Sequence, residues 1–240
     1  MAMVGGTIAA PGELQAVLSL GDCSAILVEP DVVLTSAHCI QRPIQSVSVA
    51  KRDIRVSHCE AHPGYRPLGL QHDVGYCKLA SATSAPTIGI GDGSHLAVGQ
   101  AVTLAGYGAS AAFAHDAGML RVVETSAVRV LDGGVEVGAA DRTACWGDSG
   151  GPVLVRDESG LRVVGIIHGV SGAICASPAE AALLDSSDRA WLEGAGAGCK
   201  QSHASGWMFA GCVGLALFTL TATVRWWRTR NRAAGRDHVG

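Results

Sequence analysis

The sequence predicts an all-β fold, on the basis of its composition, its short apolar runs and their spacing. Glycine is abundant, with 32 residues in a chain of 240, whereas aromatic residues make up only 5%. This composition favours short strands and tight turns over a helical bundle. The apolar runs are rich in β-branched side chains and are separated by turn residues such as Gly21-Asp22. Close, regular spacing of such strands is typical of a sandwich or a small barrel.

Six strands are expected in the first half of the chain, because each segment is rich in β-branched or aliphatic residues and ends at a turn signal. They are 16–20, 25–28, 32–35, 45–49, 53–59 and 74–79. In the second half, strands are predicted at 120–130, 153–155 and 163–167, and a short helix at 186–192 ends the domain.

Charge and cysteine usage limit the partners and the compartment. The formal net charge is −3, which is too small to suggest nucleic acid as a partner, and a basic patch occurs only at the extreme C-terminus. Eight cysteines are many for a reducing cytosol. Disulfides and an oxidising compartment are therefore expected.

The stretch from Cys145 to Pro152 carries the chemistry. Ser149 lies in Gly-x-Ser-x-Gly, where the glycines let the backbone turn sharply and leave neighbouring N–H groups free to point at one spot. A serine becomes a nucleophile at neutral pH only beside a base, which a carboxylate in turn orients. His38, within Leu-Thr-Ser-Ala-His-Cys, and Asp73, within His-Asp-Val-Gly-Tyr-Cys-Lys-Leu, supply these two groups.

These three segments, in the order His, Asp, Ser, resemble the trypsin/chymotrypsin family of serine endopeptidases. The resemblance implies that Ser149 attacks the peptide carbonyl, that His38 is the general base and that Asp73 orients it. It also implies a protease domain at 3–194 made of two antiparallel six-stranded β-barrels, at about 7–98 and 99–194. Residues 102–108 resemble the first strand of the second barrel.

The same resemblance assigns roles around the nucleophile. The N–H groups of Gly147 and Ser149 are expected to form the oxyanion hole. The segment that begins at Met3 resembles the one freed when a zymogen of this family is cut, so the α-ammonium of Met3 is expected to pair with Asp148. An activating protease is therefore an expected partner. No signal peptide is visible at 1–7, which has neither a charged n-region nor an apolar h-region.

Three disulfides are expected. Two match bridges of the family, one beside the catalytic histidine and one between the nucleophile loop and the opposite wall of the specificity pocket. The third matches no common bridge of the family, but its cysteines lie on predicted neighbouring strands close to the catalytic aspartate. In this order the pairs are Cys23–Cys39, Cys145–Cys175 and Cys59–Cys77.

The predicted substrate-binding residues depart from the family pattern. Thr143 takes the place of the pocket floor, and a neutral floor favours an apolar or small side chain before the scissile bond over Arg or Lys. Glu180 or Ala179 takes the place of a glycine that usually lines the pocket. If Glu180 points inward, a preference for Arg or Lys before the scissile bond is expected instead. His168-Gly169-Val170 replaces Ser-Trp-Gly in the substrate strand, and His168 stands where a serine usually donates to the catalytic aspartate.

Two other interpretations of these motifs are weaker. In α/β-hydrolases, Gly-x-Ser-x-Gly forms a strand-to-helix elbow and the order is Ser, acid, His. Here Pro152 and the β-branched residues after it favour a turn that enters a strand. A zinc site is suggested by the Cys-x-x-His spacing among His58, Cys59, His62 and His72, but a disulfide uses the cysteine more simply. No metal and no organic cofactor is expected.

The C-terminal tail predicts a membrane segment. A Gly/Ala/Ser-rich linker at 195–206 precedes an uncharged apolar run from Trp207 to Val224, and a bilayer is spanned by about 17 to 25 such residues. The basic segment 225–240 is expected in the cytoplasm, which places the protease outside. The tail also resembles C-terminal sorting signals of secreted bacterial proteins. A permanent anchor and a tail removed by a processing enzyme both stay open, and Cys199 is a candidate processing or lipid-attachment site.

The sequence thus predicts a serine endopeptidase that hydrolyses protein or peptide substrates through an acyl-enzyme. It is expected at the cell membrane, held by a single span, or released after tail processing. The alternative is a catalytically inactive homologue that binds a partner at the cell surface, suggested by Met3 at the cleavage position and by His168 and Gly169 in the substrate strand. An esterase on the same barrel is a third hypothesis.

Overall fold

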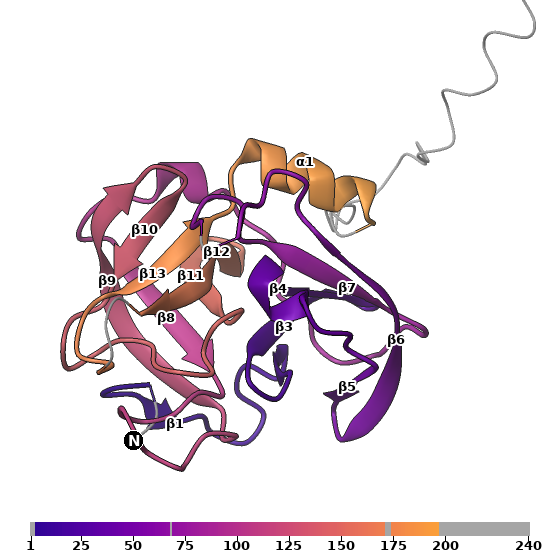
Figure 1. Ribbon diagram of the computed structural model, residues 1–240, viewed down its shortest axis with the longest axis horizontal. Helices are drawn as coiled ribbons and strands as arrows, with labels where there is room; N and C mark the ends of the chain where they lie inside the picture. The colour runs from indigo at the N-terminus through magenta and orange to yellow at the C-terminus, as the bar shows by residue number, and fades with distance from the viewer. Residues whose placement is uncertain (1–2, 68, 171–173, 197–240) are drawn as a thin grey trace, which may run out of the picture. The chain divides into compact units, whose positions relative to one another are not determined.

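The computed structural model describes residues 3–67, 69–170 and 174–196. Within these residues the chain forms two antiparallel sheets, one from each half of the domain, followed by one α-helix (Figure 1). None of the helices in this part of the chain is long and apolar enough to cross a membrane. The predicted span and basic tail, 207–240, lie outside the described residues, as does Cys199.

The first barrel is built from six strands in the order β2-β3-β4-β7-β6-β5. Neighbouring strands pair antiparallel, and β5 returns to contact β2, so the sheet rolls up. All six agree with the strands that the sequence predicts, with ends shifted by at most two residues. They are β2 (Val17–Ser19), β3 (Ser24–Glu29), β4 (Val32–Thr35), β5 (Ser46–Val49), β6 (Arg52–Ala61) and β7 (Gly75–Leu79).

The second barrel has the strand order β9-β10-β13-β12-β11-β8 and is closed by pairing of β8 with β9, while the two-residue β1 adds an edge to β9. Two antiparallel six-stranded barrels with a short C-terminal helix were the predicted architecture, and it is confirmed. The strands are β1 (Thr7–Ile8), β8 (Ala101–Gly106), β9 (Arg121–Leu131), β10 (Gly134–Val137), β11 (Pro152–Asp157), β12 (Gly160–Val170) and β13 (Ala179–Leu183).

Three strands, β1, β10 and β13, escape the prediction from sequence. The clearest case is β13, whose sequence Ala-Glu-Ala-Ala-Leu consists of strong helix formers. It is extended because it fills the gap between β10 and β12 and pairs with both. Tertiary pairing therefore overrides local propensity here.

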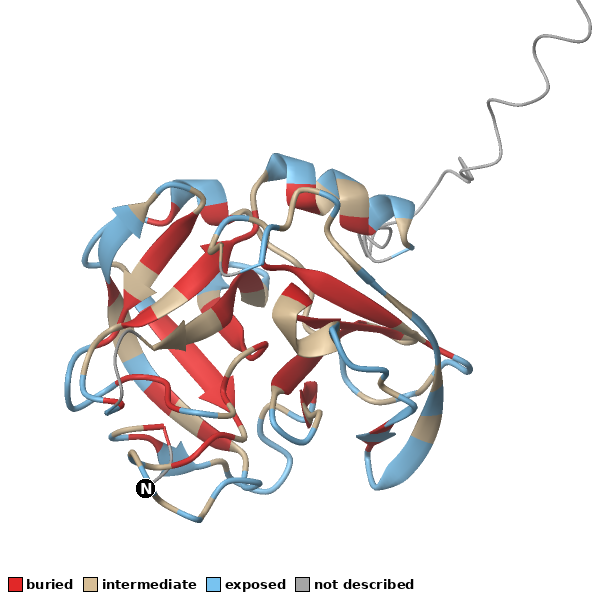
Figure 2. Ribbon diagram, in the orientation of Figure 1, coloured by how far each residue is buried: buried red, intermediate tan, exposed pale blue. Residues whose placement is uncertain are grey.

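Buried residues are concentrated in the strands of both barrels (Figure 2). One core cluster joins the first barrel to residues of the second half, among them Leu154 and Ile166, and a further cluster fills the second barrel. The helix α1 (Ser186–Gly194) begins at an Asp185 capping box. Its Trp191 packs against Tyr76 of β7, with ring centroids 5.2 Å apart. The C-terminal helix of the domain therefore covers part of the first barrel.

All three predicted disulfides are present. Cys23–Cys39 joins the start of β3 to the segment after β4, Cys59–Cys77 joins the paired strands β6 and β7, and Cys145–Cys175 ties the loop before β11 to the loop before β13.

Candidate active site

The first barrel brings His38 and Asp73 to the same end of a strand pair. His38 lies in the 3-10 helix η1 (Ala37–Ile40), which follows β4, and Asp73 lies in the loop that leads into β7. Because the last residue of β4, Thr35, pairs with the first residue of β7, Gly75, these two segments must meet. A Cβ atom at Gly75 would lie 2.7 Å from a side-chain carbon of Ile40. Glycine at this position therefore lets η1 approach the strand.

The carboxylate of Asp73 is completely buried and holds His38 at two points. Its Oδ2 atom lies 2.6 Å from Nδ1 of the imidazole, and its Oδ1 atom accepts the backbone N–H of His38 at 3.0 Å. Burial acts to raise the pKa of Asp73, but the hydrogen bonds from His168 and His38 outweigh it and hold that pKa below its usual value. The aspartate is thus kept ionised and orients the ring of His38.

A second imidazole reaches the same carboxylate oxygen. Nδ1 of His168 lies 2.6 Å from Oδ2 of Asp73, and the ring of His168 packs edge-on against the ring of His38 with centroids 5.4 Å apart. The hydrogen bond to Asp73 raises the pKa of His168 against the effect of burial. The replacement of serine by histidine noted in the sequence therefore preserves the bond to the aspartate.

Ser149 comes from the second barrel and lies beside His168 and the Cys23–Cys39 disulfide. Its Oγ donates to the backbone carbonyl of His168 at 2.9 Å, so the hydroxyl is directed at this carbonyl and not at the ring of His38. Its own carbonyl accepts the N–H of Ser24 in β3 at 2.7 Å. The structure thus joins Asp73 to His38, and His168 bonds both Asp73 and Ser149, whose hydroxyl is turned to the carbonyl of His168 on the adjacent strand.

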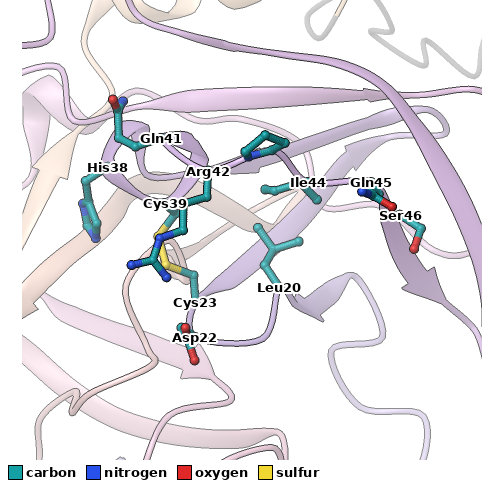
Figure 3. Close-up of a pocket in the computed structure, with 11 residues that line it drawn as sticks. Leu20, Asp22, Cys23, His38, Cys39, Gln41, Arg42, Ile44, Gln45 and Ser46 are labelled. Carbon is teal, nitrogen blue, oxygen red and sulfur yellow. A yellow bond between two sulfur atoms is a disulfide. The ribbon is translucent and has the colours of Figure 1, made fainter.

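A cavity of ≈ 660 Å³ adjoins His38. Figure 3 shows His38 at one side of it, next to the Cys23–Cys39 disulfide, with Arg42 over the disulfide and the apolar side chains of Leu20 and Ile44 further along. This cavity gives a bound chain room beside the imidazole.

The two N–H groups predicted for the oxyanion hole belong to peptides whose carbonyls are fixed. The carbonyl before Gly147 accepts the N–H of Ala109 at 2.8 Å, and the carbonyl before Ser149 accepts the N–H of Gly151 at 2.9 Å. In a trans peptide the N–H points opposite to the C=O. The N–H groups of Gly147 and Ser149 are therefore directed away from these partners, and neither donates to another group in the described part of the chain.

Asp148, the residue before the nucleophile, is fully buried. Its two oxygens accept the N–H groups of Gly108 and Cys145, each at 2.8 Å. Burial raises the pKa of this carboxyl to about 7, although the two hydrogen bonds and the nearby charge of Arg121 act in the opposite direction. A Cβ atom at Gly106 or Gly108 would collide with the carboxyl group. These glycines leave space for a charge that has no ion-pair partner in the described residues.

The segment predicted to supply that partner is seated in the second barrel. The side chain of Met3 is fully buried, and the carbonyl of Val4 accepts the N–H of Thr143 at 3.2 Å. This bridge places the start of the described chain beside the predicted pocket floor. Residues 1–2, whose removal is expected to free Met3, lie outside the described residues.

The predicted specificity residues lie on neighbouring segments. Thr143 is completely buried, and its hydroxyl is without a partner within the described residues. Glu180 pairs with Gly169 across β12 and β13 and is half-buried, and Val170 pairs with the residue before it. The negative charge of Glu180 acts on His168. The floor is therefore neutral and polar, with one acidic side chain beside the substrate strand.

Two groups of potential metal ligands occur in the described residues, apart from the disulfide-bonded Cys23 and Cys39. In each group one ligand atom per residue lies within 4.8 Å of the others. One is the group described above around Asp73, whose ligand atoms are already hydrogen-bonded to one another. The other contains His62, His72 and Asp188.

The second group is also internally bonded. Nδ1 of His72 lies 2.8 Å from Oδ1 of Asp188. Nδ1 of His62 accepts the N–H of Gly64 at 3.1 Å, which leaves the ring proton on Nε2, the nitrogen that faces Asp188. A protonated ring nitrogen cannot bind a metal. Of the zinc ligands considered from sequence, Cys59 is bridged to Cys77 and is not free.

Sequence reasoning missed the small polar residues that join the two barrels at the site. Ser24 is buried in β3, and its Oγ donates to the carbonyl of Gly147 and accepts the N–H of Tyr107, each at 2.9 Å. Ser36 donates to the carbonyl of Ile167 at 2.8 Å. The available signal was a serine at the end of each of two apolar strands, Ser24 at the start of β3 and Ser36 directly after β4.

In a comparison with known families, the model described as Trypsin matches residues 3–186. The match covers both barrels up to the start of α1 and includes the segments of His38, Asp73 and Ser149. It therefore extends over more than half of the 240 residues.

Proposed function

The chain belongs to the trypsin family of serine proteases, and from this premise we propose that it is a serine endopeptidase acting on protein or peptide substrates. The proposed catalytic triad is Ser149, His38 and Asp73. The observation that carries the proposal is the 2.6 Å contact between the buried Asp73 carboxylate and Nδ1 of His38. This contact fixes the tautomer in which Nε2 can accept a proton.

In the proposed reaction, rotation about the Cα–Cβ bond of Ser149 turns Oγ from the carbonyl of His168 toward Nε2 of His38. Hydrogen bonds of this kind often become short and aligned only when substrate binds. As Oγ attacks the substrate carbonyl carbon, Nε2 takes the hydroxyl proton. The amine leaves with that proton, and water then hydrolyses the acyl-enzyme by the same route.

The N–H groups of Gly147 and Ser149 are proposed to stabilise the negative oxygen of the tetrahedral intermediate. Their orientation is supported by the hydrogen bonds of the carbonyls on the opposite sides of the same peptides. Loss of one such donor costs about 3 to 4 kcal/mol of transition-state stabilisation.

For specificity we propose a preference for apolar or small residues before the scissile bond. Thr143 provides no negative charge at the proposed pocket floor, because its side chain is neutral and completely buried. A peptide library tests this directly. Dominant cleavage after Arg or Lys would contradict it and would direct attention to Glu180.

The proposed setting is the outer face of a membrane, with the apolar run 207–224 as anchor and removal of residues 1–2 as the activating step. Release of the α-ammonium of Met3 would supply a positive charge for the buried Asp148. N-terminal sequencing of the mature protein tests the activation step.

A fluorophosphonate probe tests the assignment as an enzyme, because it reacts with an activated serine. We expect labelling of the N-terminally processed protein, loss of labelling in Ser149→Ala, and normal labelling in a control, Ser94→Ala, at an exposed position. No labelling of folded, processed protein would instead favour the inactive homologue, for which the family match gives no support. Turnover of peptide and ester substrates separates the endopeptidase from an esterase.

A further inference from the structure

Two imidazoles share one carboxylate oxygen in the active site. We propose that His168 is a positioning residue that holds the first proton taken up by the histidine pair and so leaves the other ring neutral. The proposal rests on the function proposed above. It concerns how the side chain of His168 acts through Asp73 and His38.

The geometry forces the two rings to act together. Nδ1 of His38 and Nδ1 of His168 each lie 2.6 Å from Oδ2 of Asp73. An ionised carboxylate only accepts hydrogen bonds, so both Nδ1 atoms must carry protons. A further proton can therefore be added only at the Nε2 atom of one ring or the other. Each ring then competes with its neighbour for that proton.

The strand geometry explains why His168 reaches the aspartate. In the ladder between β12 and β13, Ile167 pairs with Ala181 and Gly169 pairs with Glu180, so His168 is an extra residue in the register. Such a bulge bends a strand and redirects a side chain. At this bulge, the carbonyl of His168 accepts from Ser149 while its ring reaches Asp73.

The charged groups around the pair favour His168 as the site of the first proton. In the described residues, two charged groups act on His168, namely Asp73 before β7 and Glu180 on β13, and the ring of His38 in η1 packs edge-on against it. The hydrogen bond to Asp73 is the largest influence and raises the pKa of His168; burial opposes it, and the charge of Glu180 reinforces it. Glu180 thus supplies an additional negative charge on the side of His168.

Once His168 is charged, a proton on His38 would place a second positive charge close to the first. The ring centroids are 5.4 Å apart. At the effective dielectric constants typical of such sites, this repulsion corresponds to about one to two pH units. A neutral side chain at position 168 would remove this repulsion between the two rings.

The test is the pH dependence of kcat/KM in processed wild type and in His168→Asn, whose side-chain amide can donate to Asp73 but does not titrate. We expect the acid limb of the variant to move to higher pH by about one to two units. The readout is the pH at which kcat/KM falls on the acid side, whatever its maximal value. His95→Asn, at a side chain that is 86% exposed, is the matched control and should leave the limb in place.

A loss of kcat/KM at all pH values with an unmoved acid limb would show a purely structural role and overturn the proposal. A second measurement does not depend on activity. In Ser149→Ala, NMR titration of the histidine Cε1–H resonances should show His168 responding to the first proton, and the opposite order would also overturn it. Inactivity of the processed wild type would refute the proposed function, while this titration would still test the coupling of the pair.

Discussion

At the scale of single residues, the site depends on where charge is buried. Asp73 and Asp148 are both fully buried, yet the pKa of Asp73 is lowered and that of Asp148 is raised. The difference follows from their partners, because two imidazoles donate to Asp73 whereas Asp148 receives only two backbone N–H groups. Asp73 is therefore held in its ionised form, whereas the carboxyl of Asp148 binds a proton up to a pH of about 7.

Replacing Asp73 by asparagine should prevent His38 from acting as a base, although asparagine has nearly the same shape as aspartate. An amide can donate to Nδ1, which favours the tautomer with the proton on Nε2, the nitrogen that must accept the serine proton. We expect kcat to fall by about 10⁴-fold, a magnitude taken over from other triads of this family. Steady-state kinetics on a peptide substrate checks this, with the exposed Asp53→Asn as control. A loss confined to KM would contradict the assigned role.

The raised pKa of Asp148 predicts how stability depends on pH in a chain whose Met3 amine has not been released. The carboxyl binds a proton more readily when folded, at about 7, than when unfolded, at 3.8. Its favourable contribution is therefore present at low pH and is lost as pH rises through this window, by up to several kcal/mol, on the order of 4.

Denaturant unfolding of unprocessed wild type and Asp148→Asn between pH 4 and 8 measures this contribution. The free energy of unfolding should decline more steeply with pH in the wild type than in the variant. Release of the Met3 amine should remove much of the decline, since an ammonium stabilises the ionised form. Equal slopes for the two unprocessed proteins would contradict the prediction.

At the scale of elements, disulfides and a helix hold the loops that carry the site. Cys145–Cys175 fixes the nucleophile loop, and Cys59–Cys77 joins β6 to β7. Near the start of α1, Asp188 bonds His72, the residue directly before Asp73. His72 has a φ of +56°, an uncommon conformation for a residue with a side chain. The helix therefore tethers the loop that carries the proposed orienting carboxylate.

Cys145–Cys175 and Cys59–Cys77 should differ in their effect on activity but not in their effect on stability. They close loops of similar length, 30 and 18 residues, so replacing either pair by alanine should cost about 2 to 5 kcal/mol. Only the Cys145/Cys175 replacement should also lower kcat/KM strongly, because it frees the nucleophile loop. Denaturant unfolding and peptide hydrolysis, measured on both double variants, check this. Equal losses of activity in the folded variants would count against it.

The contact between α1 and the first barrel should make the protein sensitive to acid. His62 stacks on His72 with centroids 4.3 Å apart. Burial is the main cause of its lowered pKa; the charge of His72 adds to it, and Asp188 opposes it. The folded chain therefore binds this proton less readily than the unfolded chain does. The stability contributed by neutral His62 is present above about pH 6.5 and is lost as pH falls through the lowered pKa.

His62→Asn should flatten the loss of stability below pH 6.5, since asparagine can still accept the N–H of Gly64 but does not titrate. The free energy of unfolding should fall less steeply with acid in this variant than in the wild type. The exposed His95→Asn is the control. A wild-type slope in His62→Asn would show that another group causes the acid sensitivity.

At the scale of the whole molecule, each barrel supplies part of the site. The proposed base and its carboxylate come from the first barrel, while the proposed nucleophile, the proposed oxyanion peptides and His168 come from the second. Buried bonds from Ser24 and Ser36 cross between the barrels directly at this point. The proposed activity therefore depends on how the two halves dock, which no single strand determines.

Removing residues 197–240 should change where the protein is found in the cell but not its peptidase activity. The family match and both barrels end before residue 197. A processed chain that ends at Gly196 should keep the kcat/KM of the full chain, while the full chain fractionates with membranes and the shortened chain does not. Membrane flotation and peptide hydrolysis measure the two properties. A full chain found entirely in the soluble fraction, with its tail intact, would contradict the anchor.

The sequence by itself determined the family, most strands and the three disulfide pairs, because these depend on short motifs and local patterns. His38, Asp73 and Ser149 were identified in this way, each from its immediate neighbours. Strand β13 was missed because its alanine-rich sequence favours a helix and only pairing on both sides makes it extended.

Only the tertiary structure decided that His168 shares the oxygen of Asp73, that the Ser149 hydroxyl faces the carbonyl of His168, and that glycines clear space for Asp148. These contacts join residues from different barrels or from neighbouring strands that are far apart in the sequence. They depend on a bulge, on strand register and on docking, which are set by the packing of the whole domain and leave no local mark in the sequence.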